Sequence, residues 1–201
     1  MMSLINALPG AVAQGLIWGI MAIGVYLTFR ILDIADLTVD GSLGTGGAVC
    51  IMLMLSGQNV WVAMAGATAA GMAAGLATGI LHTFMGIPAI LAGILTQLGL
   101  YSINLKTMGK ANQAINVDKY DLLVSLRFIR KVPFYKNTIL IVAIAIILLI
   151  VVLYWFFGTE LGCSLRATGC NDKMARAQGI NTDFNRVLGL MISNGLVALS
   201  G

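Results

Sequence analysis

Residues 138–157 read TILIVAIAIILLIVVLYWFF and contain no charged side chain. A helix that crosses the hydrocarbon layer of a membrane needs about 20 consecutive, mostly apolar residues. This stretch meets that length, and Tyr154 and Trp155 near its end are typical of the aromatic belt at a membrane interface. It therefore predicts a transmembrane helix.

The rest of the chain agrees with this prediction. Of its 201 residues, 59% are hydrophobic and only 10% are charged, against roughly a quarter charged in an average soluble domain. The further apolar segments are residues 8–29, 41–56, 60–84, 90–105 and 187–201. We predict an all-α fold, a polytopic transmembrane helix bundle that forms a single domain over residues 1–201.

Two of these segments are short. Residues 41–56 are about 16 residues long and rich in glycine, which favours a tilted, broken or re-entrant helix buried among its neighbours. The last segment is still apolar at Gly201, about 15 residues after its start, so we expect the chain to be a fragment of a longer protein.

Glycines recur at intervals of four residues in two segments. Small residues at this spacing let helix backbones approach closely, which drives helix packing in lipid. We expect these glycines to mediate packing within the chain, with a dimer interface as the alternative: Gly15, Gly19, Gly71, Gly75 and Gly79.

Several classes of function are unsupported. There is no G-x-x-x-x-G-K-[ST] phosphate loop, and a single histidine, His82, disfavours a histidine-based metal cluster or a Ser-His catalytic triad. The net charge of +4 comes from basic residues in loops, which suits anionic lipid better than nucleic acid. We expect no catalytic residue, no metal and no cofactor.

The polar stretch of residues 158–181, GTELGCSLRATGCNDKMARAQGIN, predicts two short helices. One covers residues 164–168 and ends at Gly169. The other has Asn171 as its N-cap, Asp172 in its first turn and Gly179 beyond its end. Its exposed face is expected to contain Met174, Ala175 and Ala177 beside Lys173 and Arg176.

This stretch resembles the cytoplasmic coupling loop of type II ABC importer permeases, those of the branched-chain amino acid and simple-sugar class. The matching residues are Gly162, Arg166, Ala167, Gly169, Asn171, Ala175, Gly179, Ile180 and Asn181. The resemblance implies that residues 158–186 face the cytoplasm and that the second short helix, with Met174, docks on an ATP-binding subunit. Asp172 stands where the family usually has proline, but both residues suit the first turn of a helix.

The start of the chain is similar to a less characterised, amino-acid-type branch of the same class. The similarity covers Gly15, Leu16, Ala22 and Gly24, and the run DLTVDGS at residues 36–42. It implies a permease of the bacterial plasma (inner) membrane that is not itself an enzyme. The implied partners are a separate ATPase, a substrate-binding lipoprotein, membrane lipid and a second permease copy, most simply as a homodimer.

Polar residues within or beside the apolar segments are candidates for the transport pathway. Asp36 and Asp40 are notable because carboxylates near a membrane segment are costly and often functional, although Asp40 also suits a helix N-cap. Polar side chains in membrane helices also serve as interhelical hydrogen bonds. The other candidates are Gln14, Thr96, Gln97, Ser102 and Asn104, of which Gln97 and Asn104 are taken as pathway candidates beside the two aspartates.

The two polar loops give conflicting topologies. Residues 106–136 carry seven basic side chains and residues 158–186 carry four, so the positive-inside rule places the first loop in the cytoplasm. The family resemblance places the second loop there, and we follow the resemblance. The N-terminus is then outside if residues 41–56 span fully and inside if they are re-entrant.

The function expected from the resemblance is passage of a small solute, most simply an amino acid, delivered by an external binding protein and driven by ATP hydrolysis in a partner chain. An ATPase-independent secondary transporter or channel is the alternative. That alternative predicts ionisable residues deep within the long spans, and these spans contain none.

Overall fold

A computed structural model describes residues 2–110 and 138–201, and every regular element in that part of the chain is helical, as predicted. The elements are α1 (Met2–Tyr26), the π-helix η1 (Leu27–Ile31), α2 (Val39–Leu55), α3 (Val60–Thr83), α4 (Ala89–Met108), α5 (Thr138–Gly158), α6 (Glu160–Cys170), α7 (Asp172–Ala177) and α8 (Thr182–Ser200).

Four stretches of helix in the described residues are long and apolar enough to cross a membrane: Gly10–Ile31, Val60–Thr83, Ala89–Met108 and Ile139–Gly158. The 17-residue α2 is apolar but shorter. The prediction of a polytopic transmembrane bundle is confirmed.

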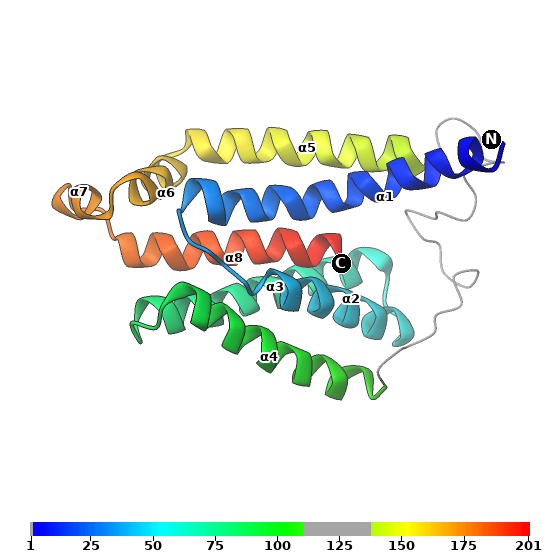
Figure 1. The fold of residues 1–201 in the computed structure, drawn as a ribbon, viewed down its shortest axis with the longest axis horizontal. Coiled ribbons are helices and arrows are strands. Elements are labelled where there is room, and N and C mark those ends of the chain that lie inside the picture. The colour runs from blue at the N-terminus through cyan, green and yellow to red at the C-terminus, as the bar shows by residue number, and fades with distance from the viewer. Residues whose placement is uncertain (1, 111–137) are drawn as a thin grey trace.

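Helix α8 lies at the centre of the bundle, with α1 on one side and α2 and α3 on the other (Figure 1). Helix α5 lies beyond α1, so only one side of it touches the bundle. The small helices α6 and α7 project from one end, on the left in Figure 1, which we name the loop end. The N-terminus lies at the opposite end.

The connection between α1 and α2 interrupts the bundle. Helix α1 continues through the single π-helical turn η1 to the loop end, and the chain then returns along an extended segment to the middle of the bundle, where α2 begins (Figure 1). We name residues 32–38 the break. Asp33 within it has a φ of 57°, which is uncommon for a residue other than glycine. The break and α2 together cross the bundle, which explains why the apolar segment at residues 41–56 is short.

Gly71, Gly75 and Gly79 of α3 lie against α8. A Cβ added at Gly75 would overlap the carbonyl of Leu190, and one at Gly79 would lie 3.0 Å from Val187 Cα. Gly71 is equally close to the backbone of Asn194. These glycines let α3 and α8 approach to backbone contact, which gives α8 its central position.

The glycines of α1 lie differently. A Cβ added at Gly15 would meet nothing within 4 Å, and one at Gly19 would meet only Ile146 Cδ1 at 4.0 Å. Their spacing therefore does not produce close helix packing in the described part of the chain. At Gly19, α1 faces the side chain of Ile146 in α5.

The helix ends on either side of residues 111–137 lie at the opposite end of the bundle from α6 and α7. Helix α4 ends and α5 begins at the end away from α6 and α7 (Figure 1). Residues 111–137, between these two helices, lie outside the described part of the chain. In this arrangement the end of α4 and the start of α5 lie on the other side of a membrane from α6 and α7.

Candidate functional site

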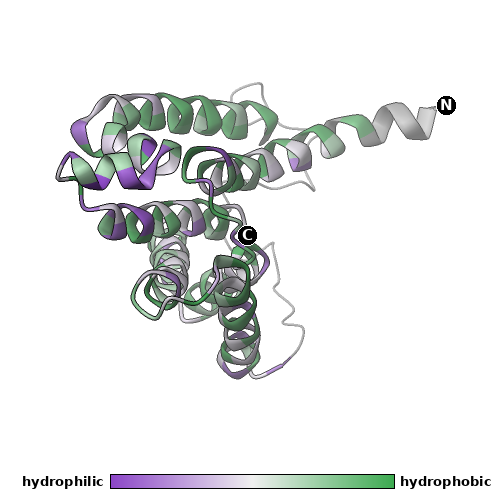
Figure 2. Cartoon of the chain, turned by 60° about the vertical axis from the view of Figure 1, so that its left-hand side comes forward, coloured by the Kyte–Doolittle hydropathy of each residue, from purple (hydrophilic) through white to green (hydrophobic). Residues whose placement is uncertain are grey.

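The candidate site at the loop end consists of α6, α7 and the first turn of α8. Figure 2 shows hydrophilic residues gathered there, whereas α5 is almost uniformly hydrophobic. Helix α6 is longer than the predicted residues 164–168, because Thr159 caps it and accepts a bond from Gly162 N at 3.4 Å. Helix α8 starts at Thr182 rather than near Val187, because Asn181 caps it through Phe184 N at 3.1 Å.

Helix α7 has the ends that the sequence predicts. Asn171 Oδ1 accepts a hydrogen bond from Met174 N at 3.1 Å, as an N-cap does. After the helix, Gly179 has a φ of 82°, a conformation that glycine adopts without steric cost. Ile180 N then donates to Ala175 O at 3.1 Å and closes the turn.

One prediction for α7, that Ala175 lies on its exposed face, is wrong. Ala175 is only 4% exposed and points into the loop. A six-residue helix that rests on the protein must bury one side, and Ala175 is the small residue on that side. Met174 is 60% exposed, and Lys173 and Ala177 are also exposed.

A cluster of charged side chains holds α7 against the start of α8. We name it the clasp, and its members are Asp172, Arg176, Asp183 and Arg186. Arg176 donates from Nε to Thr182 Oγ1 at 2.7 Å and from Nη2 to Asp183 Oδ1 at 2.6 Å. Asp172 Oδ2 lies 3.4 Å from Arg176 Nε, and Asp172 Oδ1 lies 3.3 Å from Arg186 Nη2. A helix this short is unstable alone, and the clasp supplies the support from within the chain.

The clasp also sets the ionisation of Asp172. Burial raises the pKa of this carboxyl, but the hydrogen bond with Thr182 and the nearby guanidinium groups of Arg186 and Arg176 outweigh it. The pKa of Asp172 therefore lies below its ordinary value, and the carboxylate stays ionised at neutral pH.

Two glycines of the family motif allow close backbone approaches by α6. A Cβ added at Gly162 would overlap Phe156 O at the turn from α5, and one at Gly169 would overlap Ile31 O at the end of η1. Leu165 of α6, 1% exposed, packs in an apolar cluster with Leu32. Helix α6 thus rests directly on the start of the break.

A buried asparagine that the sequence analysis missed joins α6 to α8. Asn185 Nδ2 donates to Thr168 Oγ1 at 3.0 Å, and Ser164 Oγ donates to Asn185 Oδ1 at 3.3 Å. Asn185 lies just beyond the N-cap of α8, where the sequence reads as a polar loop. The remaining motif residues, Arg166 and Ala167, are exposed and half-buried respectively.

Of the pathway candidates, Asp36 lies in a buried polar network around the break. Its Oδ1 accepts a bond from Thr38 N at 2.8 Å, and its Oδ2 accepts one from Asn194 Nδ2 at 2.7 Å. Ser42 Oγ donates to Asn194 Oδ1 at 2.5 Å, and the hydroxyls of Thr38 and Thr78 lie 2.7 Å apart. Asp36 is 5% exposed and Asn194 is fully buried.

The other three candidates lie apart from this network. Helix α2 begins at Val39, so Asp40 lies in its first turn and is not its N-cap. Asp40 is exposed and lines a cavity of about 410 Å³ with Trp18. Gln97 and Asn104, both half-buried on α4, lie beside the glycines of α2.

Asn194 is the main residue that the sequence analysis missed. It sits in the last apolar segment, and an amide within a membrane helix is itself a signal for a buried hydrogen-bond partner. Its partner Asp36 is 158 residues away in sequence, so only the fold brings the two together.

Comparison with known proteins identifies the class. A family model described as "Branched-chain amino acid transport system / permease component" matches residues 8–201. A tyrosine transport system permease protein of Clostridioides difficile (strain R20291) is 38% identical over 199 residues, which cover 98% of this chain and 63% of that protein. The uncharacterized protein RP368 of Rickettsia prowazekii (strain Madrid E) is 35% identical over 98% of this chain and 66% of its own length.

A third relative is the autoinducer 2 import system permease protein LsrC of Yersinia pestis (strain Pestoides F), 31% identical over 90% of this chain and half of that protein. No solved structure matches the chain. The chain thus spans between half and two thirds of the length of these relatives. From the match over residues 8–201, the chain belongs to the branched-chain amino acid transport type of ABC transporter permeases of the bacterial inner membrane.

Proposed function

We propose that the chain is the membrane-spanning permease of an ABC importer, and that a separate ATPase drives it by docking on α7. A binding lipoprotein delivers the solute, and two permease copies form the pathway. The observation that carries the proposal is the loop end. There the clasp and two asparagine caps hold a six-residue helix beyond the bundle, with Met174 60% exposed.

The exposed surface at this site suits a protein partner. Met174 on α7 and Phe184 on the first turn of α8 are large apolar side chains, both more than half exposed. They stand among polar neighbours, and Lys173 adds a positive charge beside Met174. Exposed apolar anchors with a polar surround are typical of protein interfaces.

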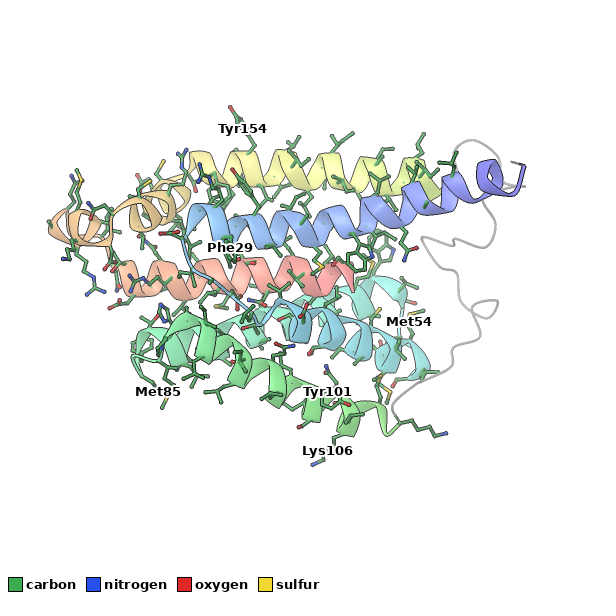
Figure 3. The ribbon with its side chains drawn as sticks, in the orientation of Figure 1. Phe29, Met54, Met85, Tyr101, Lys106 and Tyr154 are labelled. Carbon is green, nitrogen blue, oxygen red and sulfur yellow. The ribbon has the colours of Figure 1, made fainter. Side chains whose placement is uncertain are left out.

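The docking experiment follows from this surface. Ala175→Glu is a poor test, because Ala175 is buried and its replacement would disrupt the loop itself. In the full-length permease, Met174→Glu and Phe184→Glu should abolish co-purification of the ATPase and leave the bundle folded. Met85→Glu is the matched control, because Met85 is equally exposed at the turn between α3 and α4 near the same end (Figure 3). Unchanged ATPase binding in both test variants would contradict the proposal.

Orientation provides a second test. If α7 meets a cytosolic ATPase, residues 158–186 face the cytoplasm and the N-terminus, at the opposite end, faces outward. In a variant without Cys50, Cys163 and Cys170, a cysteine replacing Lys173 should react with an impermeant thiol reagent only after the cells are opened. Modification in intact cells would overturn the orientation.

An amino acid is the proposed solute. The family model and the tyrosine transport relative both carry amino acid transport in their descriptions, whereas one relative imports autoinducer 2. Uptake of labelled tyrosine and leucine by cells with and without the full system separates these possibilities. Uptake of neither would remove the amino acid assignment.

The second candidate function is an ATPase-independent transporter or channel. The buried carboxylate of Asp36 is the observation in its favour, because intramembrane carboxylates occur in ion-coupled transporters. Solute uptake that continues in a strain lacking the ATPase would favour this candidate.

A further inference from the structure

The break is the one extended segment inside the described bundle, and α4, α6 and α8 pack against it. Leu32 and Ile34 pack in one apolar cluster with Leu165 of α6 and Leu190 of α8. On the α4 side, a Cβ added at Gly93 would lie 2.8 Å from Leu37 N. A displacement of α6 or α8 must therefore move the break or open a gap in this packing.

The polar contacts of the break converge on α8. Asn194 uses both functional atoms of its amide: Nδ2 donates to Asp36 Oδ2 at 2.7 Å, and Oδ1 accepts from Ser42 Oγ at 2.5 Å. Asp36 is in the break and Ser42 is in the first turns of α2, so a single side chain joins both sides of the junction. Buried hydrogen bonds of this kind are short-ranged and costly to break without a substitute.

The same helix is attached to the loop end. Asn185 bonds to Thr168 of α6, and Asp183 and Arg186 belong to the clasp that holds α7. Asn185 and Asn194 are nine residues apart, about 14 Å along one uninterrupted helix. Helix α8 therefore has fixed attachments both to the surface proposed for the ATPase and to the break.

We infer that α8 transmits movement of the loop end to the break, and that Asn194 is the positioning residue that holds the break to α8. This inference rests on the proposed function. It makes the break the part of the described chain that shifts when ATP binds. Leu32 N and Ile34 N donate back to η1, but residues 35–37 form no backbone–backbone hydrogen bond with the described residues to resist displacement. Coupling in this scheme passes through a continuous, rigid element with defined contacts at both ends.

An exchange of the two side chains tests the inference. Asn194→Asp alone places two carboxylates against each other and removes the donor to Asp36. Asp36→Asn alone sets two amides together and weakens the same bond. The double variant restores the bond to the break, because an amide at position 36 can accept from Thr38 N and donate to a carboxylate at position 194, which still accepts from Ser42. The bond from Asn194 Nδ2 to Leu190 O within α8, 3.0 Å long, is lost in Asn194→Asp and in the double variant alike, so it does not distinguish them.

The readout is a distance in the full-length permease bound to its ATPase. Spin labels go on cysteines replacing Leu37 in the break and Tyr154 on α5, both exposed, in a variant otherwise free of cysteine; Tyr154 points away from the bundle in Figure 3. In the wild-type background the distance distribution should shift between the nucleotide-free and the ATP–vanadate-trapped states. Asn194→Asp should lose the shift, Asp36→Asn should reduce it, and the double variant should recover it.

Ser193→Ala is the matched control. Ser193 is also fully buried on α8, but it donates to Gly24 O of α1 at 2.7 Å and not to the break. It should lower thermal stability and keep the shift. If both single variants fail to fold, the double variant decides: folding with a normal shift supports the inference, and failure overturns it.

Three results would overturn the inference: no shift in the wild-type background, a full shift in folded Asn194→Asp, or no recovery in the double variant. Each of these presumes that the ATPase binds. If no ATPase associates with the wild-type permease, the proposed function fails instead, so the two failures are distinguishable.

Discussion

Helices α5 and α8 differ in a way that reverses the usual relation between hydrophobicity and burial. Helix α5 is the most apolar of the candidate spans, yet Val142 is the one buried side chain among its described residues. Helix α8 carries two asparagines and a serine that are buried, and its sequence does not qualify as a span. In a membrane the solvent is apolar, so the most apolar helix lies against lipid and small or polar residues form the interior.

The largest expected effect comes from breaking the contact between α3 and α8. Gly75→Leu forces a side chain into the carbonyl of Leu190 and should prevent recovery of a folded bundle. Overpacking a core ordinarily costs about 1–3 kcal/mol, and the cost is higher here because the obstacle is backbone, which cannot move aside as a side chain can. Gly15→Leu is the control, because a Cβ at Gly15 meets nothing within 4 Å. Thermal unfolding in detergent measures both. Equal stability would show that α8 is not the centre of the bundle.

The next effect compares leucines of the two helices. Leu190→Ala in α8, where the side chain is fully buried, should lower the free energy of unfolding by about 2 kcal/mol. The cavity left behind accounts for most of this cost, because lipid is as apolar as leucine and the gain from moving leucine out of its surroundings is small. Leu148→Ala in α5, where the side chain is 64% exposed, should change stability by less than about 0.5 kcal/mol. Unfolding in a detergent series gives the two values. A larger cost for Leu148 would mean that protein, not lipid, covers α5.

A smaller effect is expected for the amide of Asn185. Asn185→Ala removes the bonds to Thr168 and Ser164 and should cost about 1 kcal/mol, since both hydroxyls keep a backbone partner. The control is Asn104→Ala, a half-buried amide with no hydrogen bond among the described residues. Amide hydrogen exchange should show faster opening of α6 only in the Asn185 variant.

The smallest effect is the pH dependence of the clasp at the start of α8. The pKa of Asp172 is lower in the folded protein than in the unfolded chain, where it has the ordinary value of about 3.9. The ionised carboxylate therefore stabilises the fold above that pH, and the stabilisation is lost as the pH falls through the folded pKa. The stability difference between wild type and Asp172→Asn should be constant from about pH 7 to pH 5 and should shrink below about pH 4. A difference that grows on acidification would contradict this sign.

Local signals in the sequence were enough for part of the site. Asn171, Asp172 and Gly179 mark the ends of α7 through short-range capping and turn chemistry, and the structure places those ends as expected. The direction of Ala175 was not predictable in the same way. Which side of a six-residue helix is buried depends on the clasp, and the clasp joins residues of two helices.

The bundle shows the same division. Residue types and segment lengths determined by themselves that the chain is an all-α membrane protein, because lipid requires long apolar helices with internally bonded backbones. Only the tertiary structure decided that α8 is central, that α2 starts in mid-bundle, and that Asp36 meets Asn194. Hydropathy reports the preference of a residue for lipid or water, whereas these features depend on which backbones approach closely and which buried polar groups find partners.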